Sequence, residues 1–199
     1  DSGECLFQWD DVTNKVFVGT IPQAECDPSG IFDFKETGDY VAEISDRTGH
    51  GGSGYFWNLE IRSPKMDFAV YSGRSTLPIV GYRPLKVDFI IERREGFEGD
   101  VRLEFTDNVT ARNHVATSGV DRISALLTYG GSRYIAPRPT KVYALADIGG
   151  CTLRREVVPC NEQEQAFAWR HLVPAQSFVI RAVPPKKKAS KPVTKHEKK

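Results

Sequence analysis

The chain has 199 residues, enough for one large domain or two modest ones, and its 40% hydrophobic and 11% aromatic residues can fill packed cores. No apolar run approaches the roughly 20 residues of a membrane helix, and no Lys/Arg stripe with interleaved aromatics predicts nucleic-acid binding. The net charge of +1 conceals an asymmetry, because the last sixteen residues carry seven lysines and one glutamate.

The sequence begins at Asp1 without a methionine, so we expect a processed or truncated N-terminus, such as one left after removal of a secretion signal. Residues 1–63 are predicted to form a first β-sandwich. Its clearest strand is YFWNLEIR at 55–62, whose period of two is typical of a half-buried strand. The segment YVAEIS at 40–45 alternates in the same way. The apolar side chains predicted to share the buried face of 55–62 are Tyr55, Trp57, Leu59 and Ile61.

The stretch DRTGHGGSGYFW at 46–57 joins these two predicted strands and admits two interpretations. Four glycines favour a loose hairpin turn, because glycine adopts positive φ without steric cost. Ser53, His50 and Asp46 could also form an improvised hydrolytic triad. The chain lacks the G-x-S-x-G elbow of the esterase fold, and one flexible loop has no supporting residues to hold such a triad. The turn is therefore the preferred interpretation.

A second β-sandwich is predicted over residues 64–183, after a Pro- and Gly-rich stretch that begins near residue 64. One continuous sandwich of about 180 residues is the alternative. Turn signals such as REGFEGD, YGGSR and DIGG separate the alternating segments. The strands predicted in this half are 86–92, 101–106, 122–129, 141–147, 165–173 and 177–183. The fold class predicted for the chain is therefore all-β, with two antiparallel sandwiches.

The four cysteines fall into two sequence-local pairs without the spacing of a zinc site. We predict disulfides Cys5–Cys26 and Cys151–Cys160, the second closing a small loop across a hairpin. Disulfides would indicate a secreted or periplasmic protein. Four buried free thiols are the alternative. Asn108, in Asn-Val-Thr, is a glycosylation acceptor only in a secreted eukaryotic protein.

The candidate ligand contacts are aromatic. Phe56 faces away from the predicted core of its strand, so it either packs on a second sheet or is exposed. With outward Tyr129 and Tyr134 it could stack on a polysaccharide. Asp27, Asp33, Asp39 and Asp46 could hold Ca²⁺, but their spacing matches no calcium loop, so surface turns are preferred and no cofactor is predicted.

Several of these motifs resemble a known family. Four segments resemble the strands and turns of the bacterial pre-peptidase C-terminal domain, in the same order. They are Val18-Gly19-Thr20-Ile21, Phe32-Asp33-Phe34, Gly38-Asp39-Tyr40 and 55–61. The later part is similar to the immunoglobulin-like segment that accompanies such domains in large secreted proteins of planctomycetes. The likeness covers about residues 12–183, but the two cysteine pairs and the missing D.D.F motif depart from the family pattern. It implies a noncatalytic β-sandwich module without active-site residues.

The last segment, 184–199, is predicted to be a disordered, lysine-rich tail, because Pro184-Pro185 cannot extend a central strand and nothing beyond them is large and apolar. Such a tail could contact an acidic surface. Together these features predict a noncatalytic structural or accessory subunit that contacts other proteins of a surface or periplasmic assembly. The alternative is a carbohydrate-binding module.

Overall fold

The computed structural model describes residues 5–8, 30–46, 48–81, 83–165 and 169–185. Thirteen β-strands and no helix are present in these ranges, so the all-β prediction is confirmed there. The strands are β1 (Asp67–Ser72), β2 (Thr76–Val80), β3 (Leu85–Arg94), β4 (Val101–Phe105), β5 (Val109–Arg112), β6 (Val115–Ala116), β7 (Arg122–Tyr129), β8 (Ile135–Thr140), β9 (Val142–Ile148), β10 (Cys151–Glu156), β11 (Cys160–Gln165), β12 (Trp169–Pro174) and β13 (Phe178–Val183).

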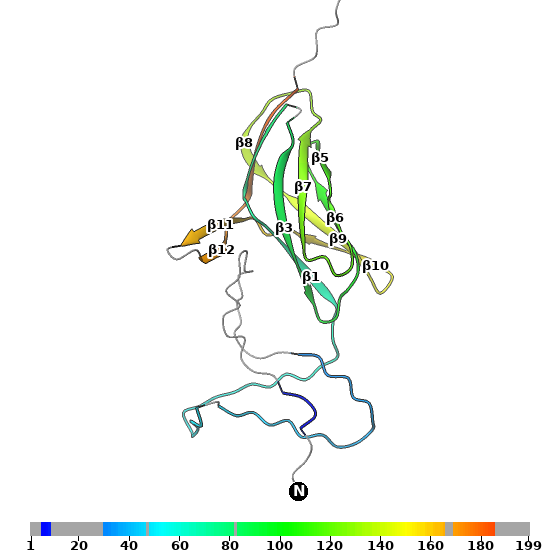
Figure 1. Cartoon of the computed structure of the whole chain (residues 1–199), viewed down its shortest axis with the longest axis vertical. Coiled ribbons are helices and arrows are strands. Elements are labelled where there is room, and N and C mark those ends of the chain that lie inside the picture. Colours follow the sequence, from blue (N-terminus) through cyan, green and yellow to red (C-terminus); the bar gives the residue numbers. More distant parts are fainter. Residues whose placement is uncertain (1–4, 9–29, 47, 82, 166–168, 186–199) are drawn as a thin grey trace, which may run out of the picture.

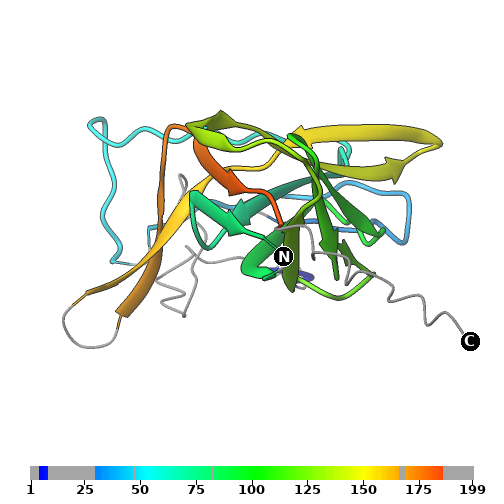
Figure 2. The same ribbon diagram turned by 90° about the horizontal axis from the view of Figure 1, so that it is seen from above.

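The strands form two four-stranded sheets and two smaller ones. One large sheet has the order β1-β3-β7-β5 and the other β10-β9-β4-β6, and all their ladders are antiparallel. A three-stranded sheet, β2-β13-β8, includes the parallel pair β13 and β2. The last sheet is the hairpin β11-β12, which projects from the side of the body (Figures 1 and 2).

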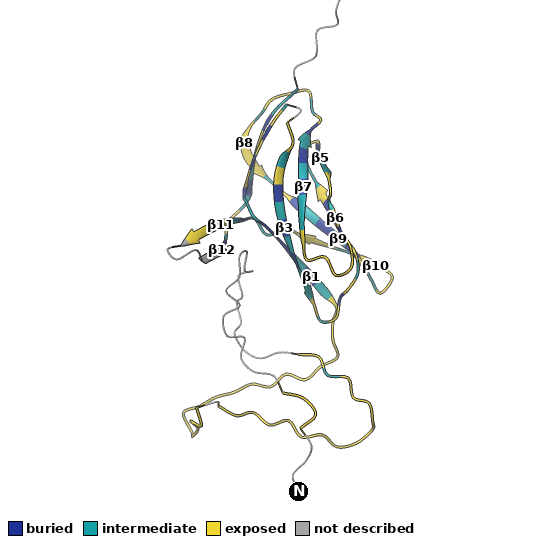
Figure 3. Ribbon diagram, in the orientation of Figure 1, coloured by how far each residue is buried: buried dark blue, intermediate teal, exposed yellow. Residues whose placement is uncertain are grey.

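The core lies between these sheets, as the alternation predicts. In β3 the side chains of Val87, Phe89 and Ile91 are buried, while the intervening ones are partly exposed. They meet Val101 and Leu103 of β4 in one continuous hydrophobic cluster. The same cluster includes residues of β2, β7, β9 and β13 (Figure 3). Burial of these apolar faces is the main term that stabilises the sheets.

Two tight turns set the ends of neighbouring strands. Asp107 and Asn108 have φ of 57° and 56° between β4 and β5, the conformation of a two-residue turn, which Asp and Asn tolerate better than other side chains. Gly149 and Gly150 do the same between β9 and β10, with φ of 59° and 81°. The second turn delivers β10 to the outer edge of its sheet, where only β9 pairs with it.

Polar contacts hold the base of the β11-β12 hairpin to the end of β1. The Ser72 hydroxyl accepts the Cys160 backbone N–H at 3.1 Å, and the Asn161 side-chain oxygen accepts both N–H and hydroxyl of Ser75. Cys160, Leu172 and Tyr71 form a small buried cluster beside these bonds. A lone two-stranded hairpin is marginal in water, so these contacts at its base determine whether it forms.

The described residues before β1, namely 5–8, 30–46 and 48–66, contain no strand and are called the N-terminal segment below. The predicted strands at 40–45 and 55–62 are therefore wrong for this structure. A strand requires a ladder partner and a covered face, and neither segment has one here. Trp57, predicted as core, is 72% exposed. Figure 3 shows this part of the chain almost wholly as exposed ribbon.

At the other end, β13 ends at Val183, directly before Pro184, as predicted. The tail prediction for residues 186–199 falls outside the described residues. The predicted strands 86–92, 101–106, 122–129, 141–147 and 177–183 all correspond to observed strands. The prediction 165–173 overlaps β11 and β12, but residues 166–168 are not described.

Candidate functional site

The most unusual surface of the molecule is the N-terminal segment. Of the seventeen large hydrophobic side chains that are exposed in the described residues, thirteen precede β1. Within the described part of the chain, by contrast, every buried hydrophobic side chain lies between Phe68 and Ala182. Soluble monomers seldom leave so many apolar side chains together in water. The thirteen are Leu6, Phe7, Ile31, Phe34, Tyr40, Val41, Ile44, Tyr55, Phe56, Trp57, Leu59, Ile61 and Met66.

Part of this surface is a small aromatic cluster. Phe32 packs edge-on against Phe34, with ring centroids 4.8 Å apart, and Phe34 against Tyr40 at 4.6 Å. Phe7 reaches Phe32 at 6.0 Å. Such edge-to-face pairs add to the stability of a local fold, yet Phe7, Phe34 and Tyr40 remain between 42% and 55% exposed. The ring contacts therefore hold these parts of the segment together but leave its aromatic side chains exposed to solvent.

The segment is fastened to the turn between β3 and β4. Two guanidinium nitrogens of Arg62 donate to the two carboxylate oxygens of Glu95, and the Lys65 backbone N–H donates to the same carboxylate. The Arg62 bonds lower the pKa of Glu95 to about 2. The Ile31 side chain lies close beside Gly96. The two points of attachment place the segment at one end of the sandwich (Figure 1).

The stretch 46–54 forms a turn and no triad. Asp46 accepts hydrogen bonds from the backbone N–H and the hydroxyl of Thr48, and the backbone bond is the larger cause of the lowered pKa of its carboxyl. His50 Nδ1 contacts the Thr48 hydroxyl and lies 4.0 Å from Asp46. Ser53 takes no part in these contacts. Gly49 and Gly52 adopt positive φ, as the turn interpretation expects.

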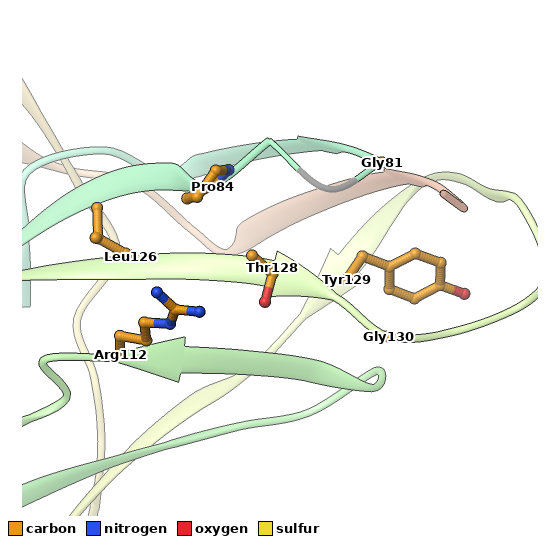
Figure 4. Close-up of a pocket in the computed structure, with 7 residues that line it drawn as sticks. All are labelled: Gly81, Pro84, Arg112, Leu126, Thr128, Tyr129 and Gly130. Carbon is orange, nitrogen blue, oxygen red and sulfur yellow. The ribbon is translucent and has the colours of Figure 1, made fainter. Parts of the chain in front are cut away.

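A shallow cleft of about 450 Å³ lies on the outer face of the sheet β1-β3-β7-β5. Arg112 extends from β5 toward Leu126 and Thr128 of β7, with Pro84 on the other side (Figure 4). The register sets Arg112 opposite Leu126 and Thr110 opposite Thr128, whose hydroxyls are 2.9 Å apart. None of the described residues that line the cleft is Asp, Glu, His or Cys.

The three predicted aromatic contacts do not form one platform. Tyr129 is only 5% exposed, which corrects the expectation that it points outward; its hydroxyl donates to the Arg133 carbonyl at 2.6 Å. Tyr134 is 56% exposed and borders a hollow of about 550 Å³ with Arg138. Phe56 is 93% exposed, as one of its two alternatives expected, but it belongs to the N-terminal segment. The β7–β8 loop, which carries Tyr134, lies at the opposite end of the long axis (Figure 1).

The predicted Cys151–Cys160 disulfide is absent, since both residues are free thiols. Cys151 begins β10 and Cys160 begins β11, in different sheets. The six extended residues of β10 span about 17–20 Å, far beyond the reach of a disulfide. Cys5 is also free and exposed, and its predicted partner Cys26 lies outside the described residues. The secreted or periplasmic location stays a prediction.

Two further kinds of site were sought in the described ranges. They contain no group of three or more His, Cys, Asp or Glu side chains that could hold a metal ion. Asp33 pairs with Lys35 at 2.7 Å, and Asp27 lies outside the described residues. Nor do these ranges contain a helix long and apolar enough to cross a membrane.

The sequence reasoning missed every edge strand of the three larger sheets, namely β1, β2, β5, β6, β8 and β10. VTAR is too short to show alternation, and CTLRRE was interpreted as a disulfide-closed loop. The Gly-Gly pair before Cys151 was the available signal, because two glycines between alternating segments indicate a tight hairpin.

Comparisons with protein-family models, with curated proteins and with solved structures find no match for this chain. The resemblance to the pre-peptidase C-terminal domain and its immunoglobulin-like companion therefore stays a prediction.

Proposed function

We propose that this chain is a noncatalytic β-sandwich protein that acts as a structural or accessory subunit, through contacts of its N-terminal segment with protein. The observation that carries the proposal is the segregation of exposed apolar side chains into that segment. Val41 and Phe56 are 95% and 93% exposed, although the chain has a well-packed core of its own. An apolar surface of this extent is typical of an interaction site.

The chemistry of the reactive side chains supports a noncatalytic role. Burial raises the pKa of the Cys160 thiol to about 11, so it stays protonated at neutral pH and is a poor nucleophile. His50 bonds a threonine hydroxyl on its own turn. Protein contact is preferred to polysaccharide binding because Phe56 and Tyr134 belong to opposite ends of the molecule and cannot stack on one short glycan.

Site-specific photo-crosslinking in the source cell tests the proposal. A photoreactive residue at position 56 should give adducts with one or a few defined proteins, and an excess of unlabelled chain should compete them away. The matched control is position 115, because Val115 is 40% exposed on β6 in the sandwich. Equal adducts at both positions, or none at position 56, would contradict a role for the N-terminal segment.

A further inference from the structure

One edge of the sandwich is open to a further strand. β10 has six residues, contains no proline and, among the described residues, pairs only with β9. Five other sheet edges in the described residues are blunted. β5 has four residues and β6 two, while β2, β8 and β12 contain proline. Short edges and prolines are the usual means of preventing strand addition.

Two further edges are disfavoured for other reasons. On its free side β1 already exchanges hydrogen bonds with Val158, whose N–H donates to the Val70 carbonyl and whose carbonyl accepts the Ser72 N–H. The edge of β11 carries Glu162 and Glu164, which disfavour a strand from the acidic N-terminal segment. β10 instead carries Arg154 and Arg155, which pair with Glu104 and Asp67 of the same chain.

The hydrophobic core reaches this open edge. Leu153 of β10 and Ile148 of β9 are only partly buried, and both pack against the main cluster. A strand added beside β10 would place alternate side chains next to Leu153. If those side chains were apolar, they would cover it and extend the core by one strand.

The N-terminal segment has a stretch with these properties. Residues 55–62 alternate apolar and mostly polar side chains, and they form no ladder in this structure. The apolar side chains on one face of this stretch are each between 45% and 75% exposed. They are Tyr55, Trp57, Leu59 and Ile61. The length of eight residues is sufficient to pair with all six of β10.

Charge favours a second copy of this chain as the source of the strand. Residues 1–63 contain twelve acidic and four basic residues, a net charge of −8. Residues 64–185 contain 16 basic and 13 acidic residues, a net of +3, and residues 186–199 add a further +6. Two copies in which the first part of one meets the body of the other therefore attract. Within one chain, the Arg62–Glu95 pair holds the end of the stretch at the β3–β4 turn.

From these observations we infer that residues 55–62 of one copy add as a strand to the free edge of β10 in a second copy. The inference rests on the proposed function and specifies its partner. Strand addition of this kind gains affinity from main-chain hydrogen bonds and specificity from alternate side chains. If each copy donates its strand to the other, the result is a closed dimer. If each copy donates its strand to a different neighbour, the result is an open-ended oligomer.

Sedimentation velocity of the full chain and of two proline variants tests this inference. Leu59→Pro removes a backbone donor from the middle of the added strand, and Leu59 is exposed, so the sandwich should fold as before. Ser53→Pro is the matched control, placed in the glycine-rich turn outside the strand. We expect the unmodified chain and Ser53→Pro to self-associate, and Leu59→Pro to weaken association at least about tenfold.

Hydrogen exchange locates the acceptor. In the unmodified chain, amides of 55–62 and of β10 should become more protected as concentration rises, with no such change in Leu59→Pro. Raising the salt from about 50 to about 500 mM should weaken association, because exposed charges are screened.

A chain that is monomeric at every concentration, equal effects of both prolines, or protection of β11 in place of β10 would overturn the inference. If the chain is a monomer but still forms adducts with other proteins through position 56, the inference of strand exchange is wrong and the proposed function is retained.

Discussion

Cys160 is a buried side chain whose acid–base chemistry is strongly changed by the fold. Its side chain is fully buried at the start of β11, next to Leu172 and Tyr71. Burial raises the pKa of its thiol from 9.0 to about 11, because desolvation disfavours the thiolate. The thiol is therefore a small apolar group of the structure at neutral pH.

This shift predicts a loss of stability in alkali. As pH rises above about 9 the unfolded chain releases the Cys160 proton first, while the folded chain holds it until about pH 11, so the free energy of unfolding falls across that window. At about 1.4 kcal/mol per pKa unit, the loss is on the order of 2 kcal/mol.

Urea unfolding under reducing conditions at several values between pH 7 and pH 11 would measure it, with Cys160→Ala as the comparison. The variant should show a shallower decline above pH 9. Tyr71, whose pKa is raised to about 12 mainly by burial, titrates in both proteins, so the difference between the curves isolates Cys160. Parallel curves would contradict the assignment.

Among the elements, the hairpin β11-β12 is held at its base in part by the buried hydroxyl of Ser72. Ser72 is fully buried, and its hydroxyl accepts the Cys160 N–H and donates to the Arg74 carbonyl at 3.0 Å. Ser72→Ala leaves a buried N–H without its acceptor, so we expect a loss of about 1–3 kcal/mol in the free energy of unfolding.

Urea titration measures this loss, and hydrogen exchange should show faster exchange at the Cys160 amide. Thr152→Ala is the matched control, because its hydroxyl bonds Asp147 on the exposed side of β10, and its effect should stay within about 0.5 kcal/mol. Equal effects of the two substitutions would mean that Ser72 does not anchor the hairpin.

Alternation in the sequence predicted strands well where a ladder partner exists nearby in the fold. The segments at 86–92 and 122–129 alternate as predicted and pair with each other as β3 and β7. Residues 55–62 alternate equally well but find no partner in the described structure. Strand formation depends on non-local pairing and on a covered face, and neither can be read from the period of one segment.

The same alternation, extended to the end of β7, predicts that the Tyr129 side chain is buried, as it is in the structure. Tyr129 falls in step with Ala125 and Leu127 of β7, both of which are fully buried. The disulfide prediction erred for a different reason. Eight residues lie between Cys151 and Cys160 in sequence, but an extended strand fills most of that interval and carries the two thiols apart.

For the whole molecule, the segregation of charge matches the segregation of burial. The acidic first part carries the exposed apolar side chains. The part that carries the packed core, residues 64–185, has a net charge of +3, and residues 186–199 add +6. Folding of the sandwich and association through the N-terminal segment are thus separable, because they use different residues. Substitutions before residue 64 should change association more than the stability of the sandwich.

Removal of residues 186–199 tests this separation from the other end of the chain. The last strand ends at Val183, and Gly81 donates its N–H to the Val183 carbonyl at 2.8 Å, so a chain that stops at Pro185 keeps every described contact of β13. We expect a free energy of unfolding within about 0.5 kcal/mol of the full chain.

The same truncation removes seven lysines and one glutamate and changes the net charge from +1 to −5. Association in low salt should therefore weaken, while calorimetry shows an almost unchanged Tm. A chain shortened to residue 177 is the control, because it lacks β13 with the core residues Phe178, Ile180 and Ala182, and it should not fold. A large fall in Tm on loss of residues 186–199 alone would show that stability of the sandwich and the charge of the last segment are not independent.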